Sequence, residues 1–267
     1  MNGRVLIVAG SDSGGGAGLQ ADIKTVTALG GYAATAVTAL TAQNTEGVFG
    51  VVPVDPDFIR QQMTLVLDDI GADAVKTGML HDAAVIDAVS DVLDDLDDRI
   101  PVVVDPVMVA QSGASLLESE AVQTLVRRLA LRATLLTPNV HEAERLTGLT
   151  ICSVADMKHA AGMMLTIGCK AVLLKGGHLG GDTVVDVLAR EEEVVQFENP
   201  RIETPHLHGT GCTLASAIAT GLAQGLSLHN AYSRARAYLQ EAIRTAPGLG
   251  HGAGPVNHGH TVRPFDV

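Results

Sequence analysis

A glycine-rich loop in the last quarter of the chain holds the side chain best suited to chemistry. Residues 208–212 read His-Gly-Thr-Gly-Cys, and an apolar helical pattern follows them directly. The free N–H groups of a helix start and the positive end of its dipole bind anions. This position is expected to lower the pKa of the Cys212 thiol from about 8.5. A thiolate there could accept a hydroxyl proton during phosphoryl transfer, and an equally weighted alternative is a cysteine that only packs.

A second glycine-rich loop follows the first apolar run. Residues 9–18 read Ala-Gly-Ser-Asp-Ser-Gly-Gly-Gly-Ala-Gly. Glycines let a ligand approach the backbone closely. The spacing does not fit the dinucleotide fingerprint, however, and the lack of Gly-Lys-Ser/Thr excludes a Walker loop. Taken alone, this loop fits a tight structural turn as well as a ligand cradle.

The elements that must position these loops alternate along the chain. Continuous apolar runs, typical of strands buried on both faces, occupy residues 5–9, 74–76, 101–104, 134–136 and 171–174. Amphipathic helical patterns lie at residues 56–70, 83–96, 118–131 and 153–167. The alternation predicts an α/β fold with a mainly parallel central sheet and helices on both faces.

Two further segments depart from this alternation. Residues 33–40 predict a strand near the pocket, and residues 183–188 and 193–197 predict a hairpin that adds an antiparallel edge to the sheet. No repeat, low-complexity linker or change of composition divides the chain. A single domain over residues 1–267 is therefore expected.

The composition narrows the class of protein. The chain is 46% hydrophobic but only 3% aromatic, so its core must be aliphatic. A net charge of −12 argues against a nucleic-acid surface and against attraction to anionic membranes. No apolar run approaches the roughly 18–20 residues of a membrane span. Three irregularly spaced cysteines form no disulfide framework, so a cytoplasmic protein is expected.

Several distinctive blocks follow one another between residue 5 and about residue 242. They are the opening loop and helix over residues 9–22, Thr-Ala-Gln-Asn-Thr at 41–45, Val-Lys-Thr-Gly-Met at 75–79, Asp-Pro-Val-Met at 105–108, Thr-Pro-Asn at 137–139 with Glu142, Lys-Gly-Gly-His at 175–178, and the 208–212 loop. These blocks, and the order in which they follow one another, resemble those of the hydroxymethylpyrimidine/phosphomethylpyrimidine kinases, a branch of the ribokinase-like superfamily.

The resemblance implies a ribokinase-like fold and a thiamine-biosynthetic phosphotransferase. The γ-phosphoryl group of ATP would pass to 4-amino-5-hydroxymethyl-2-methylpyrimidine, and a second transfer would convert the monophosphate to the pyrophosphate. Cys212 is implied as the base. The N–H groups of Gly209 and Gly211 would stabilise the transferred phosphate, and Lys175 would assist catalysis. The wider superfamily usually has Asp in place of Cys212, and Cys marks this branch and its dual-activity pyridoxal-kinase relatives.

On the substrate side, the resemblance implies that the Gln43 amide pairs with a ring nitrogen of the pyrimidine and the neighbouring amine. Met79 and Val107 would contact the ring, although a buried Met without this resemblance is as well explained as a filler of core gaps. Gly10 and Asp22, from the opening loop and helix, are implied as further substrate-binding residues.

On the nucleotide side, the resemblance implies ATP with Mg²⁺. Asp105 and Glu142 would lie near the metal, partly through water. The ATP phosphates would contact Asn139, Thr210 and Lys175. Asn139 with Glu142 three residues later also fits a capping box, and both roles can coexist.

Two lysines follow buried-looking strands, where an unpaired ammonium would be costly. A phosphate partner is expected for Lys175, and the same reasoning applies with less support to Lys76. Gln111 stands where the family commonly has Lys, which weakens the expectation of a cationic phosphate contact there. The Gly- and His-rich tail from Gly248 onward is expected to be a mobile polar terminus.

The nearest alternative is a pyridoxal kinase, or an enzyme with both activities, because one pocket could accept both rings. A ribokinase-like dehydratase is disfavoured by Cys212, since those relatives keep Asp. A ligand sensor without turnover is disfavoured by the intact set of Asn139, Glu142, Lys175 and Cys212. A homodimer is expected by analogy with the family.

Overall fold

The apolar runs become the strands of one central sheet. The computed structural model describes residues 1–109, 113, 116–117 and 119–263, and in that part the sheet has nine strands in the order β3-β2-β1-β4-β5-β6-β7-β8-β9. The strands are β1 Arg4–Asp12, β2 Tyr32–Gln43, β3 Val48–Pro53, β4 Ala74–Thr77, β5 Val102–Val104, β6 Leu135–Leu136, β7 Ala171–Leu174, β8 Thr183–Arg190 and β9 Glu193–Pro200. From β2 to β7 all neighbours pair in parallel, which confirms the predicted mainly parallel sheet.

Antiparallel strands close both edges of the sheet. Strands β8 and β9 form the predicted hairpin, and β8 pairs antiparallel with β7. Strand β3, antiparallel to β2, was not predicted. Its sequence, Val-Phe-Gly-Val-Val-Pro, is apolar, but it contains Gly50 and Pro53, two residue types that are rare in strands, and its side chains are exposed or half-buried.

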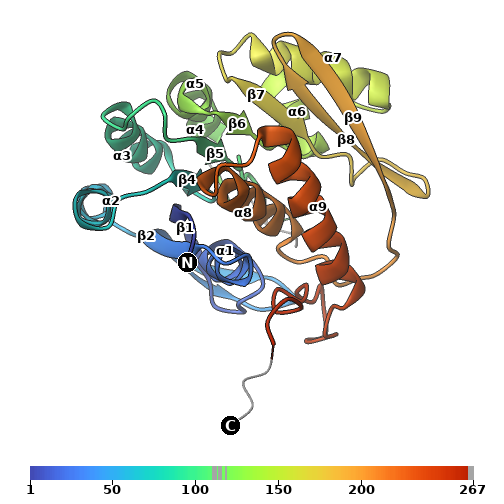
Figure 1. Cartoon of the computed structure of the whole chain (residues 1–267), viewed down its shortest axis with the longest axis horizontal. Coiled ribbons are helices and arrows are strands. Elements are labelled where there is room, and N and C mark those ends of the chain that lie inside the picture. Colours follow the sequence, from blue (N-terminus) through green and yellow to red (C-terminus); the bar gives the residue numbers. More distant parts are fainter. Residues whose placement is uncertain (110–112, 114–115, 118, 264–267) are drawn as a thin grey trace.

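Helices cover both faces of the sheet, as predicted (Figure 1). On one face lie α1 Gly18–Ala28, α8 Thr210–Ala223 and α9 Leu228–Arg244. On the other lie α2 Pro56–Asp69, α3 Ala83–Asp94, α4 Ser119–Thr124, a π-helical turn η1 Leu125–Leu129, α5 Ala130–Arg132, α6 Val140–Thr147 and α7 Val154–Leu165. In the described ranges, no helix combines the length and apolar character needed to cross a bilayer.

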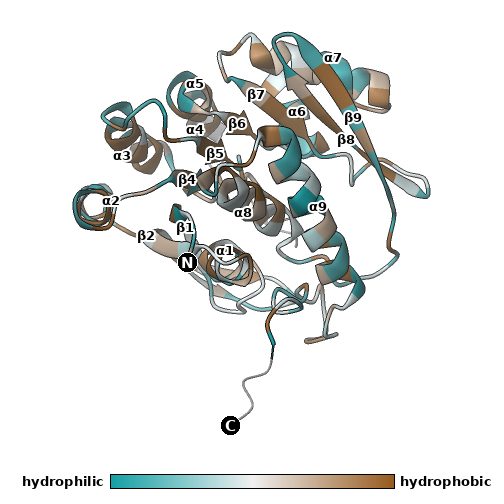
Figure 2. Ribbon diagram, viewed as in Figure 1, coloured by the Kyte–Doolittle hydropathy of each residue, from teal (hydrophilic) through white to brown (hydrophobic). Residues whose placement is uncertain are grey.

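The two faces of the sheet have separate apolar cores. Alternate residues of β1 point to opposite sides, so Leu6 and Val8 pack with α2 and α3, whereas Val5 and Ile7 pack with α1 and α8. The central strands are accordingly among the most hydrophobic parts of the ribbon (Figure 2). Helix α8 lies between the sheet and α9 and is buried at every position from 213 to 221. This burial holds the start of α8 rigidly at the edge of the sheet.

A buried carboxylate joins β8 to α9. Asp186 is fully buried and accepts hydrogen bonds from the Tyr232 hydroxyl at 2.8 Å and from the Gly176 N–H at 2.9 Å. A buried acceptor that loses a donor cannot turn to water. Asp186 therefore fixes the backbone directly after β7.

Replacement of Tyr232 by Phe removes one donor from Asp186 and little volume. We expect the free energy of unfolding to fall by about 1–3 kcal/mol, measured by urea denaturation. The matched control is Tyr32→Phe, because Tyr32 is 41% exposed. The control should stay within roughly 0.5 kcal/mol of wild type. Equal effects of the two exchanges would contradict the role given to Asp186.

Candidate active site

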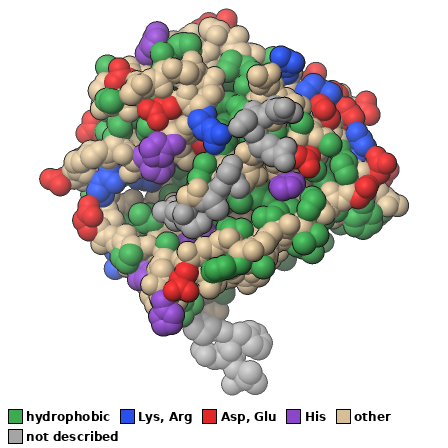
Figure 3. All heavy atoms as spheres, turned by 180° about the vertical axis from the view of Figure 1, so that it is seen from behind, with side chains coloured by type: hydrophobic (Ala, Val, Ile, Leu, Met, Phe, Trp, Pro, Cys, Tyr) green, Lys and Arg blue, Asp and Glu red, His purple; other side chains and the backbone are tan. Residues whose placement is uncertain are grey.

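The sheet's parallel strands end at a cavity of about 790 Å³. Asp12 ends β1, Asp105 follows β5, Asn139 lies just beyond β6 and Lys175 follows β7, and all four line this cavity. Open α/β sheets bind ligands at this edge because the strand ends and the loops that follow them converge there. Figure 3 shows the face behind that of Figure 1, where a hollow is bordered by basic and histidine side chains.

The glycine loop at residues 208–212 delivers the start of α8 to this cavity. Helices α2, α3, α7 and α9 begin with a side chain that caps their N–H groups, whereas α8 begins at Gly209 without one. Gly209 has φ +83°, and a side-chain carbon there would collide with the carbonyl oxygen of Gly16. The two glycine loops are therefore in direct contact. Gly211 and Thr210 line the cavity, and the uncapped start of α8 suits an anion.

Cys212 also lines the cavity, but its predicted acidity is wrong. Burial raises the pKa of the Cys212 thiol to about 12. The Lys76 ammonium and the Gly18 N–H act in the opposite direction and do not compensate. The helix start was expected to dominate, but loss of water around the thiol outweighs it. Cys212 is thus a thiol in the free protein at neutral pH.

Asp22 does not line the cavity, so the placement does not support the implied contact with substrate. Its side chain is fully buried and pairs with the fully buried Lys76, with 2.8 Å between Oδ2 and Nζ. The Ser216 hydroxyl donates to its other oxygen at 2.7 Å. Lys76 does line the cavity, and its partner is thus a carboxylate of α1. Asp22 acts beneath the site by holding the Lys76 ammonium near Cys212.

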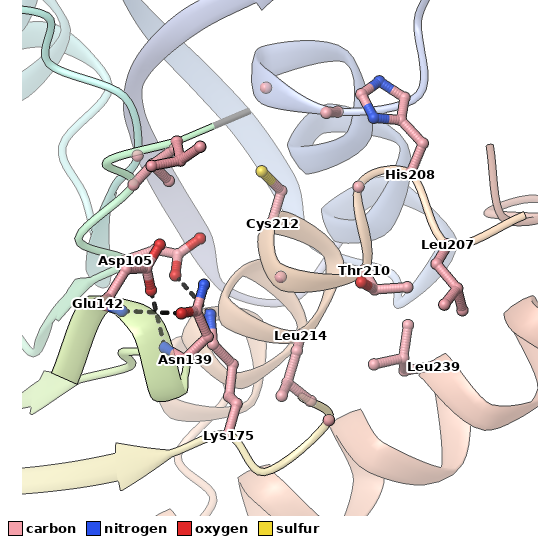
Figure 4. A pocket seen from close by; sticks show the side chains of 18 of the residues that line it. Asp105, Asn139, Glu142, Lys175, Leu207, His208, Thr210, Cys212, Leu214 and Leu239 are labelled. Carbon is pink, nitrogen blue, oxygen red and sulfur yellow. Dashed lines mark hydrogen bonds and ion pairs between the residues drawn. The ribbon is translucent and has the colours of Figure 1, made fainter. Parts of the chain in front are cut away.

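A second buried pair joins Lys175 to Asp105 (Figure 4). The Lys175 ammonium donates to Asp105 Oδ1 at 2.9 Å, and the Thr137 hydroxyl donates to the same oxygen at 3.0 Å. Burial alone would raise the pKa of Asp105, but the ammoniums of Lys175 and Lys76 hold it below its usual value. Asp105 is therefore an anion, and Lys175 is presented to the start of α8, where Gly211 leaves room for it.

Asn139 and Glu142 form the capping box at the start of α6. The Asn139 N–H donates to Glu142 Oε2 at 2.8 Å, and the Glu142 N–H donates to Asn139 Oδ1 at 2.9 Å. The structural alternative for these residues is thus confirmed, while both also line the cavity. Burial raises the pKa of Glu142 to about 7, the Asp105 carboxylate adds to the rise, and Lys175 opposes it.

No group of three or more His, Cys, Asp and Glu side chains in the described residues is arranged to hold a metal ion. The two carboxylates Asp105 and Glu142 nevertheless fit a Mg²⁺ ion that is carried by a nucleotide. Mg²⁺ prefers oxygen ligands and is commonly held by one or two carboxylates together with phosphates and water. The raised pKa of Glu142 indicates a carboxylate that lacks positive charge, and a cation would supply it.

The residues implied for the pyrimidine are brought together at the other end of the cavity. Gln43, Met79, Val107 and Gly10 all line it. A side-chain carbon on Gly10 would lie 2.7 Å from Cε of Met79, so the glycine makes room for the thioether. The Thr38 hydroxyl donates to the Met79 carbonyl at 2.6 Å, which fixes the backbone there.

Sequence reasoning missed an apolar wall of the cavity beside Thr210. Leu207, Leu214 and Leu239 gather there from the 208–212 loop region, α8 and α9 (Figure 4). Leu239 lies on a different helix from Leu214, and each of the three resembles an ordinary core residue. Only their convergence distinguishes them, so no sequence pattern could have found them.

Asp12 and His208 were also missed as a pair that joins the two glycine loops. Asp12 accepts the N–H groups of Gly14, Gly16 and Ala17 at 2.8, 3.0 and 2.8 Å. His208 Nε2 lies 2.8 Å from Asp12 Oδ2. An Asp that follows a strand and precedes glycines is a common turn signal. The sequence contains this turn signal, but it does not indicate that the partner of Asp12 is a histidine 196 positions away.

The prediction of a mobile tail is wrong for residues 248–263. Val256 and His258 are buried, and His258 Nε2 lies 2.9 Å from the Thr213 hydroxyl of α8. The Gly254 carbonyl accepts from the His208 N–H at 3.1 Å. Small residues allow this close packing. The same Gly-rich composition led to the prediction of a mobile terminus. The expectation on Gln111 lies outside the described residues.

Comparison with known proteins decides the family. A family model described as phosphomethylpyrimidine kinase matches residues 12–257. The chain belongs to the phosphomethylpyrimidine kinase family. This kinase is 47% identical to the hydroxymethylpyrimidine/phosphomethylpyrimidine kinase of Bacillus subtilis, over 96% of this chain and 94% of that protein. It is 53% identical to the thiamine biosynthesis bifunctional protein ThiED of Geobacter sulfurreducens over 96% of this chain but only about half, 52%, of that relative.

Comparison of the structure with solved structures shows the same relationship to vitamin-kinase proteins as the comparison of sequences. A Bacillus subtilis pyridoxal kinase, solved as an ADP complex, matches the kinase with a TM-score of 0.89 and 36% identity over 97% of this chain and 98% of that one. The predicted ribokinase-like α/β fold is therefore confirmed. The kinase is a phosphotransferase, as the resemblance implied.

The contact between the glycine loops gives a sharp test. Replacement of Gly209 by Ala should lower kcat/KM at least about 100-fold, because the loops must separate and the start of α8 must shift away from the transferred phosphate. Gly225→Ala is the matched control, since Gly225 has φ +82° but no atom within 4 Å of the added carbon. The control should cost roughly 1 kcal/mol of stability and leave the kinetics unchanged. Equal kinetic losses would show that backbone strain alone is responsible.

The pKa of Glu142 predicts how stability depends on pH without nucleotide or metal. Unfolding returns this pKa from about 7 toward 4.5, so the folded protein holds the extra proton between these values. The free energy of unfolding should therefore fall as pH rises from about 5 to 7, by on the order of 2 kcal/mol. Glu142→Gln keeps the capping box and should remove this fall.

Glu144→Gln is the matched exchange on the same helix. The Ile151 N–H holds the pKa of Glu144 below its usual value of 4.5, so the contribution of Glu144 to stability changes below about pH 4.5 and its loss should leave the fall between pH 5 and 7 in place. An unchanged slope in Glu142→Gln would contradict the buried, partly protonated carboxyl.

Proposed function

We propose that this kinase transfers the γ-phosphoryl group of ATP to the hydroxymethyl group of 4-amino-5-hydroxymethyl-2-methylpyrimidine, and then to the phosphate of that product, in thiamine biosynthesis. The observation that carries the proposal is the shared cavity. Gln43 ends β2 and Met79 follows β4, whereas Asn139 and Lys175 follow β6 and β7 further along the sheet, and Cys212 at the start of α8 lines the same cavity. The named Bacillus subtilis relative supports the same substrates.

Cys212 is the proposed base. The substrate O–H bond breaks as its oxygen bonds to the γ-phosphorus and the bond from that phosphorus to the β-phosphate oxygen breaks. The proton passes to the Cys212 thiolate, and the electron pair stays on the leaving ADP oxygen. Since the thiol has a pKa of about 12, the reactive thiolate is a minor form stabilised by Lys76 and the Gly18 N–H.

The phosphate groups are stabilised by the protein on two sides. The N–H groups at the start of α8, from Gly209 to Cys212, face the transferred phosphate, and the Lys175 ammonium balances its charge from β7. Asn139 and Thr210 are the proposed nucleotide-phosphate contacts. Asp105 and Glu142 would hold Mg²⁺ through its water, and the ion when bound neutralises charge on the β- and γ-phosphates.

Pyridoxal is a second candidate substrate. The Bacillus subtilis pyridoxal kinase shares this fold at a TM-score of 0.89, so a cavity of the same architecture can serve a pyridine ring. Gln43 favours the pyrimidine, because an amide matches a ring nitrogen beside an amine. We therefore place pyridoxal as a weaker substrate.

A cytoplasmic homodimer is the proposed working form. The three cysteines are unpaired, as is usual in a reducing compartment. Leu40 of β2 and its partner Val52 on β3 form an exposed apolar patch, with 53 and 63% of these residues exposed. Such a patch beside an active site is a surface that a second copy can cover.

The first experiment follows ATP consumption with hydroxymethylpyrimidine, its monophosphate and pyridoxal in parallel. Wild type should turn over both pyrimidines and prefer them to pyridoxal. Cys212→Ala should lose about 100- to 10,000-fold in kcat, the usual contribution of a general base. Cys212→Asp should recover part of it, and its rate should lose the rise with pH that a thiol of high pKa gives to wild type. Full activity of Cys212→Ala would remove Cys212 from the mechanism, and no turnover of any substrate would refute the kinase proposal.

A further inference from the structure

Gln43 is held between two polar neighbours that determine which way its amide faces. Its backbone is tied to Ser13, whose hydroxyl donates to the Gln43 carbonyl at 2.8 Å and accepts from the Gln43 N–H at 2.8 Å. The side-chain Nε2 position lies 3.2 Å from His208 Nε2, and the Oε1 position lies 3.4 Å from the Thr41 hydroxyl. The oxygen and the nitrogen of an amide have nearly the same shape, so the hydrogen bonds to their neighbours decide which atom occupies which position.

The His208 side admits only one proton arrangement. His208 Nε2 is 2.8 Å from Asp12 Oδ2, and the same oxygen already accepts the N–H groups of Gly16 and Ala17. Burial alone would raise the pKa of Asp12, but hydrogen bonds from His208 and the loop N–H groups hold it below its usual value. An ionised carboxylate at that distance requires a proton on His208 Nε2. An amide NH₂ group facing this N–H would place donor against donor, whereas an amide oxygen at 3.2 Å can share the N–H with Asp12 as its second, longer acceptor.

The Thr41 side leads to the same conclusion independently. The Thr41 hydroxyl has one proton and donates it to the Ser11 carbonyl at 2.8 Å. It has no second proton to give to an amide oxygen. Its oxygen can accept one, however, so the amide group nearest to it should be the NH₂.

We infer that His208 and Thr41 together orient the Gln43 amide, with Oε1 toward His208 and Nε2 toward Thr41, and so make the chain specific for a ring edge that carries an acceptor beside a donor. In this order each end keeps one free function in the cavity. Oε1 has a lone pair for the substrate amine, and Nε2 has an N–H for the ring nitrogen. His208 is a positioning residue, since it acts through Gln43. This inference rests on the proposed function, because the ring that Gln43 reads is the substrate of that proposal.

The C-terminal tail contacts both the His208 loop and the segment that follows Gln43. The His208 N–H donates to the Gly254 carbonyl, and residues 208 and 255 pair as a short parallel bridge. The Ala253 N–H donates to the Thr45 carbonyl at 2.9 Å, two residues after Gln43. The tail therefore holds the histidine and the glutamine segment against each other, so that their distance does not depend on the ligand.

The proton on His208 can be tested without substrate. Long-range ¹H–¹⁵N correlation spectra of the free protein distinguish a protonated from an unprotonated ring nitrogen, and the His208→Gln variant assigns the signal. We expect Nε2 of His208 to be protonated at pH 7. An unprotonated Nε2 would overturn the inference, whatever the enzyme phosphorylates.

The specificity is tested by calorimetric binding of two probes in the absence of ATP. One is the 4-amino substrate, and the other is its 4-oxo analogue, which presents a ring N–H beside an oxygen and so reverses donor and acceptor. Wild type should bind the 4-amino probe at least about 100-fold more tightly, because both hydrogen bonds to Gln43 are mismatched in the analogue. His208→Met removes the orienting N–H and should reduce this preference to about tenfold or less.

Two variants separate orientation from packing. His208→Gln keeps an N–H donor at the Nε2 position and should retain most of the preference. His206→Met makes the same exchange two residues earlier, outside the cavity lining, and should not change it. A preference that is the same in His208→Met and wild type would overturn the inference while leaving the proposed function intact. Failure of wild type to bind the 4-amino probe would instead refute the proposed function, and with it the specificity inferred here.

Discussion

Two buried ammonium groups impose the strongest physical constraint on this structure. Lys76 is fully buried and Lys175 nearly so, and neither could remain charged there without a carboxylate in contact. Asp22 on α1 and Asp105 after β5 supply these partners. Helix α1, the ends of β4, β5 and β7, and the start of α8 must therefore meet at one point. Buried pairs contribute little net stability, and here they create a field around Cys212 and the start of α8.

That field explains why Cys212 and Glu142 have unusual acidities in the same cavity. Each is buried, and burial favours the neutral form of both groups. The neighbouring ammoniums reduce the effect without abolishing it. The free site is thus short of positive charge near Glu142, which suits a ligand that arrives as a metal-bound nucleotide. Membership of the phosphomethylpyrimidine kinase family and the presence of Asp105 and Glu142 both fit such a ligand.

Contact between distant loops makes the site precise. Gly209 touches Gly16, Asp12 bonds to His208, and the tail closes over both. These contacts link the first strand, the last third of the chain and the C-terminal segment. A rigid connection of this kind would keep the proposed ring and phosphate positions aligned within one cavity.

The sequence by itself determined the alternation of strands and helices, the hairpin predicted at 183–188 and 193–197, the capping box at Asn139 and the residues of the two glycine loops. These depend on local periodicity and on backbone chemistry. Family resemblance supplied the cavity residues Gln43, Met79, Lys175 and Cys212, which the structure brings together, although their roles stay predictions.

Only the tertiary structure decided the partner of Lys76, the place of Asp22 beneath the cavity, the acidity of Cys212 and the order of the tail. Each depends on which groups from remote segments surround a side chain once water has been removed. Desolvation and contact across 196 positions of sequence, as between Asp12 and His208, leave no local pattern. The free energies of buried charges and hydrogen bonds are therefore set by the folded neighbourhood, whereas helices and strands are set largely by the local pattern of residues.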